Sequence, residues 1–227
     1  MRVATIICNY NYGEYIEDAI LSALNQSYPT TVCVFDDAST DNSLEVISKY
    51  KENIVFAQSP NKVGPSYARN TLIELGINDF DYFAILDADD IMYPNKIEKC
   101  MELITSDPTI GVVYADYDIL NVQTGNLIRE YKQPFDRIVL GSECIVHSGA
   151  LISKQALKDV QNQMGYYNNS MRTCEDYELW VRISKKYMIA HLAESLTLVR
   201  NHNQNSTNTV DKAIWEENWR KVAEAYA

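Results

Sequence analysis

The stretch Tyr82-Phe83-Ala84-Ile85-Leu86-Asp87-Ala88-Asp89-Asp90 joins an apolar run to three carboxylates. The apolar run predicts a buried strand, and open α/β folds bind their ligands at the carboxyl ends of such strands. Carboxylates this close repel one another unless a cation or hydrogen-bond donors offset their charge. A hard divalent ion, Mg²⁺ or Mn²⁺ holding substrate phosphates, is the natural counter-charge. For this motif alone, a solvated acidic turn after a strand is the alternative.

Strand and helix patterns alternate over the first half of the chain. Short apolar runs predict strands at residues 3–8, 31–35, 54–57, 82–86 and 111–115. Apolar residues spaced three and four apart predict helices at residues 16–24, 44–50 and 65–75, and a further helix that Pro94 opens. This alternation is typical of a mostly parallel central sheet flanked by helices. The polar motifs that follow the strands then gather at one edge of the sheet.

The pattern changes after Asp116. We expect a hairpin over 118–129, a strand over 144–152, a helix from 154, a polar loop over 165–173, a helix from about 175, a strand over 189–199, a polar loop over 201–208 and an amphipathic helix from 211. Neither repeats nor linkers interrupt these elements. The sequence therefore predicts a single domain over residues 1–227, with a smaller mixed carboxyl-terminal part.

The bulk composition excludes several classes of protein. Lys and Arg number 20 against 31 Asp and Glu, and the resulting net charge of −11 argues against nucleic-acid binding and against a polybasic lipid-binding patch. No apolar run is long enough to span a bilayer, and the amino-terminal run is too short for a signal peptide. The five cysteines are widely spaced, which is typical of reduced thiols in a cytosolic protein and does not favour a zinc site.

Five motifs in order resemble the family-two glycosyltransferases, which are inverting enzymes of the GT-A fold that use nucleotide-sugar donors. The matching stretches are Cys8-Asn9-Tyr10-Asn11, Asp36-Asp37-Ala38-Ser39-Thr40-Asp41, Asn61-Lys62-Val63-Gly64-Pro65-Ser66-Tyr67-Ala68-Arg69-Asn70, Asp87-Ala88-Asp89-Asp90, and Glu175-Asp176 ahead of Leu179-Trp180. They cover most of the chain to about residue 202. One departure is Cys8, which stands where the family commonly has proline.

The resemblance implies a GT-A (Rossmann-like) fold, with a nucleotide-sugar-binding half over 1–115 and an acceptor-side half over 116–227. It also implies a role for each matching polar residue. On the side of the nucleotide, Asp37 would accept hydrogen bonds from uracil, and Asn9 and Asn11 would flank the base and ribose. Arg69 would lie near the diphosphate, and Asp87 would contact ribose or sugar. Asp89 would bind Mn²⁺ or Mg²⁺, His202 would face the diphosphate or metal, and Asp176 would be the general base.

Simple chemistry is consistent with these roles. Glycosyl transfer expels a charged diphosphate, which a metal on Asp89 and the permanently charged Arg69 would neutralise. The attacking hydroxyl needs a carboxylate to take its proton. Asp176 starts a predicted helix, and we expect the helix dipole to keep it ionised.

Each of these residues also has a plainer interpretation. Asp36 and Asp37 would serve as caps of the following helix, and Glu175-Asp176 as favourable first-turn charge. Arg69 would be an exposed helix residue and His202 a surface histidine. Asn9 and Asn11 would be turn residues only.

The leading hypothesis is a metal-dependent inverting transferase that moves a sugar from a UDP-sugar to a glycan or lipid-linked acceptor. It would work in the cytoplasm or, through peripheral association, at the inner face of the membrane. An Asp-x-Asp phosphatase is disfavoured because the motif follows the fourth strand, and a nucleotidyltransferase because the first strand lacks a Gly-rich phosphate loop. The non-enzyme alternative is a nucleotide-binding scaffold of the same fold without transfer activity.

Overall fold

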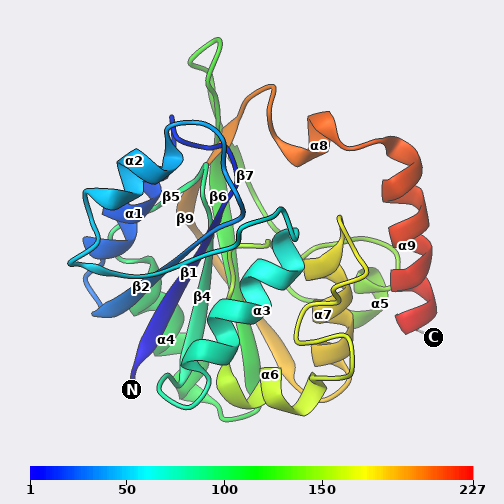
Figure 1. Cartoon of the computed structure of the whole chain (residues 1–227). Coiled ribbons are helices and arrows are strands. Elements are labelled where there is room, and N and C mark those ends of the chain that lie inside the picture. The colour runs from blue at the N-terminus through cyan, green and yellow to red at the C-terminus, as the bar shows by residue number, and fades with distance from the viewer. Residues whose placement is uncertain (227) are drawn as a thin grey trace.

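Strands and helices follow one another as the sequence predicts in the computed structural model, which describes residues 1–226 (Figure 1). The strands are β1 (Val3–Asn9), β2 (Thr30–Asp36), β3 (Ile54–Gln58), β4 (Tyr82–Asp87), β5 (Ile91–Met92), β6 (Ile110–Asn121), β7 (Leu127–Glu130), β8 (Leu151–Ser153) and β9 (Met188–Asn201). The helices are α1 (Ile16–Leu24), α2 (Ser43–Ser48), α3 (Pro65–Gly76), α4 (Lys96–Ser106), α5 (Arg137–Leu140), α6 (Lys154–Val160), α7 (Glu175–Ser184), α8 (Ser206–Thr209) and α9 (Lys212–Tyr226).

The strands form one sheet in the order β3-β2-β1-β4-β8-β6-β9-β5, with β7 paired to β6. The first four strands of this order are parallel, as are β6 and β9. In the register of the sheet Asn9 lies opposite Asp36, and Cys8 lies opposite Asp87. The carboxyl ends of β1, β2 and β4 therefore meet at one edge, and the predicted α/β fold is confirmed.

Helices cover both faces of the sheet because the strands bury side chains on both sides. On β1, Ala4 and Ile6 pack into one core with α3, α6 and α7, whereas Val3 and Ile7 pack into a second core with α1, α2 and α4. Figure 1 shows α3, α6 and α7 in front of the sheet. This arrangement leaves the carboxyl edge of the sheet as the place where loops and helix ends meet.

The carboxyl-terminal half differs from expectation mainly at residues 144–152. The expected strand forms only at Leu151–Ser153, where it pairs antiparallel to β4 and β6. The preceding residues form a loop because their polar groups bond outside a strand ladder: Ser148 donates to Asp87 at the end of β4, and the Gly149 amide donates to His147. The sequence also did not predict the short elements β5, α5 and α8. The expected hairpin is confirmed as β6–β7, which projects from the top of the view in Figure 1.

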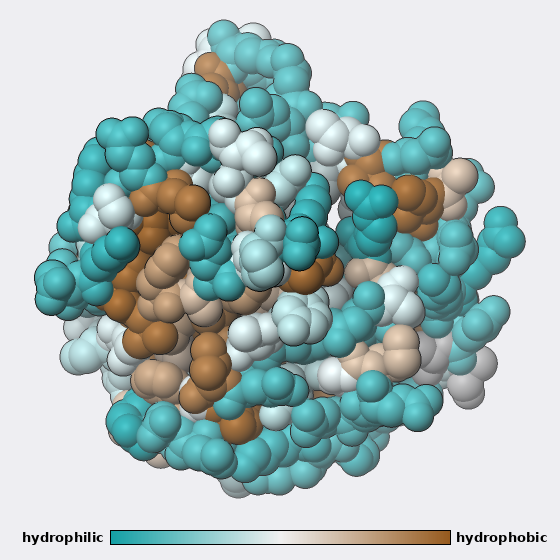
Figure 2. Space-filling view, viewed as in Figure 1, coloured by the Kyte–Doolittle hydropathy of each residue, from teal (hydrophilic) through white to brown (hydrophobic). Residues whose placement is uncertain are grey.

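The proposed division of the chain at residue 115 falls inside β6, which runs through it. The division into a nucleotide-sugar-binding half and an acceptor-side half concerns function, and it stays a prediction. Among residues 1–226, no helix has both the length and the apolar content needed to cross a membrane. The face shown in Figure 2 is mainly hydrophilic, in keeping with the excess of acidic residues.

The polar loop over 165–173 is fastened to α3 by Asn70. The Asn70 side-chain amide donates to the Tyr167 carbonyl at 2.8 Å and accepts from the Tyr167 amide at 2.8 Å. Gly165, with φ of 103°, lies against this pair, and a Cβ atom there would fall 2.3 Å from the Asn70 side-chain nitrogen. The loop that leads into α7 is thereby held against α3.

We predict that Gly165→Ala destabilises the protein by about 2–5 kcal/mol, since it combines left-handed backbone strain with overpacking. The matched control is Gly125→Ala, because Gly125 also has positive φ but a Cβ there meets open space. It should cost only about 1–2 kcal/mol of backbone strain. Urea denaturation midpoints measure both, and equal losses would show that the Asn70 contact contributes nothing.

Candidate active site

Arg69 lies between two carboxylates that come from distant parts of the chain. One guanidinium nitrogen donates to Asp87 at the end of β4 at 2.9 Å, and another donates to Glu175 at the start of α7 at 2.6 Å. The Arg69 side chain is only 8% exposed, and it stacks over the Tyr167 ring at 5.3 Å. The alternative of an exposed helix residue is therefore wrong. Arg69 joins α3, β4 and α7 at the sheet edge.

Asp87 is partly exposed and is held from both sides. One carboxylate oxygen accepts from Arg69, and the other accepts from the Ser148 hydroxyl at 3.0 Å. Burial alone would raise the pKa of Asp87, but Arg69, and to a lesser extent His147 and Ser148, bring that pKa below its ordinary value. Asp87 is therefore a fixed anion, with a third of its side chain open to solvent.

Asp176 lies in the first turn of α7, next to the carboxylate that binds Arg69. Its Oδ1 accepts from the Tyr177 amide at 2.8 Å. Burial, and then the neighbouring charge of Glu175, raise the pKa of Asp176 to about 7, although Arg69 acts in the opposite direction. The expectation that the helix dipole keeps Asp176 ionised does not hold near pH 7, because burial and the charge of Glu175 bring the pKa of Asp176 to about that value. A pKa near neutrality is suited to proton transfer.

Asp37 connects the end of β2 to the start of α3. Its two carboxylate oxygens accept from the Val63 amide at 2.7 Å and from the Gly64 amide at 2.8 Å. It does not cap α2, so the capping alternative is wrong for Asp37. Each oxygen keeps a second lone pair, and the contact with uracil stays a prediction.

Asn9 and Asn11 hold the turn after β1 in place. The Asn9 amide donates to Asp36 at 2.9 Å, and Asn9 Oδ1 is buried with no hydrogen-bond partner among residues 1–226. Asn11 has φ of 57°, and its Oδ1 accepts from the Thr40 amide at 2.7 Å. Asp36 also accepts from the Ser39 amide instead of capping α2. These bonds support the turn interpretation, and the contacts with base and ribose stay predictions.

Asp89 lies in the acidic turn (residues 87–90) and carries charge that the protein does not neutralise. Burial, and then the charge of Asp87, raise the pKa of Asp89, and burial together with Asp89 raises that of Asp90 well above its ordinary value. Asp89 Oδ2 accepts from His202 Nε2 at 3.1 Å and from Asn205 at 2.9 Å. Such a surplus of negative charge is what a bound cation would relieve.

His202 is buried against the acidic turn, so the surface alternative is wrong. Its ring stacks on Tyr15 with centroids 4.5 Å apart. Nδ1 accepts from the Gln204 amide at 3.2 Å, an arrangement that assigns the proton to Nε2, which donates to Asp89. In this arrangement His202 supports Asp89. Direct binding of a metal by His202 needs the other tautomer and stays a prediction.

The acidic turn fits a divalent cation that takes part of its coordination from a substrate. Within residues 1–226, no group of three or more His, Cys, Asp or Glu side chains has the geometry of a complete metal site. Mg²⁺ and Mn²⁺ sites commonly use one or two carboxylates together with substrate phosphates. Asp89 would provide the protein's direct ligand in such a site.

Sequence reasoning did not identify three polar residues that surround the acidic turn, of which two, Arg200 and Lys96, are buried and one is half-buried. Arg200, at the end of β9, donates from its backbone amide to Asp90 at 3.0 Å and from its guanidinium to Asp18 at 2.8 Å and to the Asp89 carbonyl. Lys96 is buried and donates to the Thr197 hydroxyl at 2.6 Å. The third residue is Asn205. Of these three, only Arg200 could have been singled out from the sequence, because it lies two residues before the predicted site residue His202.

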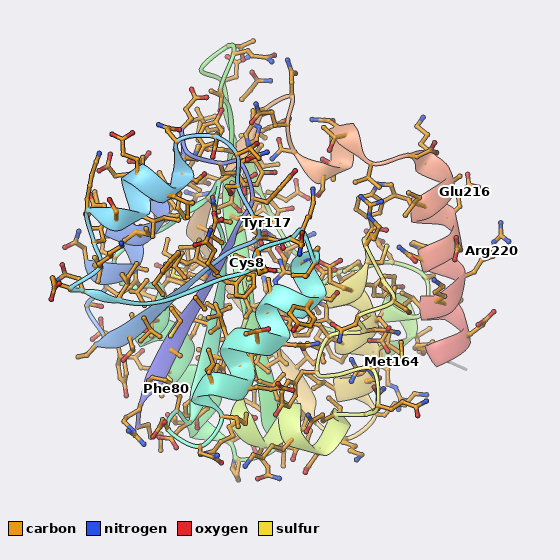
Figure 3. The ribbon with its side chains drawn as sticks, viewed as in Figure 1. Cys8, Phe80, Tyr117, Met164, Glu216 and Arg220 are labelled. Atoms are coloured by element: carbon orange, nitrogen blue, oxygen red, sulfur yellow. The ribbon has the colours of Figure 1, made fainter. Side chains whose placement is uncertain are left out.

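These contacts place the predicted residues in one connected network. Asp37 binds the start of α3, α3 carries Arg69, and Arg69 binds both Asp87 of the acidic turn and the neighbour of Asp176. Cys8, which is labelled in Figure 3, lies opposite Asp87 in the register of β1 and β4. Burial raises the pKa of Cys8 to about 12, so its thiol is a neutral filler where the family commonly has proline.

Comparison with known proteins identifies the family. The model of "Glycosyl transferase family 2" matches residues 4–161. The chain is 29% identical over 226 residues to a chondroitin synthase of Escherichia coli, in a match that covers 97% of this chain and 32% of the synthase. The chain therefore spans about a third of the length of that relative.

Two solved structures share the fold. S. aureus TarS 1-349 in complex with UDP-GlcNAc has a TM-score of 0.77 at 18% identity, covering 99% of this chain and 66% of that one. The mannosyltransferase PcManGT from Pyrobaculum calidifontis, in complex with GDP-Man and Mn²⁺, has a TM-score of 0.65 at 17% identity, covering 87% and 56%. Because the family match extends over more than half of the chain, this protein belongs to glycosyl transferase family 2 and is a transferase of the GT-A fold.

Proposed function

We propose that this chain transfers a sugar from a UDP-sugar to a hydroxyl of a glycan or lipid-linked acceptor, with inversion at the anomeric carbon and with Mn²⁺ or Mg²⁺ bound at Asp89. The observation that carries the proposal is the pairing of a carboxyl group of pKa about 7, Asp176, with a buried cation, Arg69, through adjacent residues of α7. A proton acceptor and a positive charge are the two groups that transfer to a diphosphate-activated sugar requires.

Asp176 would act as the base. A carboxylate within reach of the acceptor hydroxyl takes its proton as the new bond forms, and a base opposite the leaving group gives inversion. Asp176 is only partly buried, which would give a substrate hydroxyl access to it. Arg69 holds Glu175, so the first turn of α7 is positioned independently of the substrate.

The donor would lie along the carboxyl edge of the sheet. Asp37, Asn9 and Asn11 border the side of the base, and Asp87 and Arg69 border the diphosphate and sugar. Arg69 uses two of its five N–H groups for Asp87 and Glu175, which leaves donors for phosphate oxygens. A divalent ion held by Asp89 would neutralise charge on the leaving diphosphate. The complexes of TarS with UDP-GlcNAc and of PcManGT with GDP-Man and Mn²⁺ support a nucleotide-sugar donor and the use of a divalent metal.

The acceptor and location are proposed from the relatives and the composition. The chondroitin synthase supports a growing glycan as acceptor, with a lipid-linked sugar as the other candidate. We place the reaction in the cytoplasm or, with peripheral association, at the inner face of the membrane.

Asp176→Asn should lower kcat about 10²- to 10⁴-fold, because the amide cannot accept the hydroxyl proton. UDP affinity should stay within about two-fold, since Asp176 is not proposed to touch the nucleotide. The control is Asp79→Asn, an exposed carboxylate in a weak pair with Arg2, which should leave kcat unchanged. Full transfer activity in Asp176→Asn would refute the assignment of the base.

The pH profile provides an independent test. Because the base must be deprotonated, kcat should rise with pH up to the pKa of Asp176, about 7, and level off above it. The rate should fall about ten-fold for each pH unit below this value. A steady-state profile that stays flat from pH 5 to about 8 would contradict the proposed role.

Thermal shift with a panel of nucleotide sugars and Mn²⁺ should identify the donor. A ligand that binds the native state at about 100 times its Kd adds about 2.7 kcal/mol to the free energy of unfolding. We expect a UDP-sugar to give the largest shift, and Asp89→Asn to lose the part of the shift that requires Mn²⁺. Stabilisation without turnover of any donor would instead favour a nucleotide-binding scaffold.

A further inference from the structure

The segment after β9 folds back onto the acidic turn, where the Asn205 side chain contacts Asp89. The side-chain nitrogen of Asn205 donates to Asp89 Oδ2 at 2.9 Å and to the Arg200 carbonyl at 3.1 Å. Its side-chain oxygen accepts from the His202 amide at 2.6 Å. One amide group therefore touches Asp89, the end of β9 and the backbone of His202.

These bonds orient the Asp89 carboxylate. Oδ2 accepts from both Asn205 and His202, whereas no other residue in the described part of the chain donates a hydrogen bond to Oδ1. Hydrogen bonds to one oxygen of a ligating carboxylate set the direction of the other and retain its charge. Oδ1 is thus left for a cation while Oδ2 is held by the protein.

We propose that Asn205 is a positioning residue for the cation site: it fixes Asp89 and the backbone of His202 so that Oδ1 of Asp89 is presented in a single orientation. The inference rests on the metal dependence in the proposed function. It adds a residue to that site which lies outside every motif that led to the family.

The segment itself offers a matched control. Asn208 donates to the His202 carbonyl at 2.9 Å, so it holds the same loop at the same residue without touching Asp89. Asn205→Ala removes the bond to Asp89, whereas Asn208→Ala loosens the loop and leaves that bond in place. The pair separates orientation of the carboxylate from general stability of the loop.

The experiment titrates Mn²⁺ into metal-free protein and follows the electron paramagnetic resonance signal of free Mn²⁺. Asn205→Ala should raise the Kd for Mn²⁺ about 10- to 100-fold, the usual effect of removing a partner of a metal ligand. Asn208→Ala should change it less than about three-fold. Thermal unfolding without Mn²⁺ shows whether each variant is folded. In turnover assays, saturating Mn²⁺ should return kcat of Asn205→Ala to near the wild-type value.

Unchanged Mn²⁺ affinity in Asn205→Ala, beside wild-type protein that binds Mn²⁺, would overturn the inference and leave the proposed function standing. Equal weakening in both variants would also overturn it, because the effect would then come from the loop. Wild-type protein that turns over a donor without binding Mn²⁺ would overturn the metal part of the proposed function and this inference with it.

Discussion

The double ion pair of Arg69 with Asp87 and Glu175 is the interaction on which the candidate site depends. A guanidinium withdrawn from water needs carboxylates in good geometry, and here two carboxylates come from segments over 80 residues apart. The cost of burying these charges is met only when α3, β4 and α7 are in place together. The same contact therefore links the nucleotide side of the sheet edge to the helix that carries Asp176.

The carboxylates in and near the acidic turn differ in the direction of their pKa shifts. Arg69 beside Asp87 brings its pKa below the ordinary value, whereas burial, and then the charge of the neighbouring carboxylates, raise the pKa values of Asp89 and Asp90. Asp176 shares a helix turn with Glu175, and Arg69 lowers its pKa by less than burial and Glu175 raise it. A single arginine thus separates a permanent anion from a titratable base and leaves Asp89 in need of a cation.

Much of the fold followed from patterns that act locally. Alternating apolar runs predicted β1 to β4 and the helices between them, because burial on both faces of a parallel sheet leaves a strong signal. The strand expected at 144–152 formed only at its end, as β8, because Ser148 and His147 bond outside the ladder, which no apolar pattern reveals. The ionisation of Asp176 was also mispredicted: a helix dipole is visible in sequence, but the burial that outweighs it is not.

The amino-acid sequence by itself determined the α/β class, the family and the carboxylates at the strand ends, because those depend on residue type and on order along the chain. Only the tertiary structure decided which of these carboxylates is paired, which is proton-binding and which is held by Asn205 and His202. Pairing and pKa depend on distances and burial between segments far apart in sequence, and these arise only when the chain has folded.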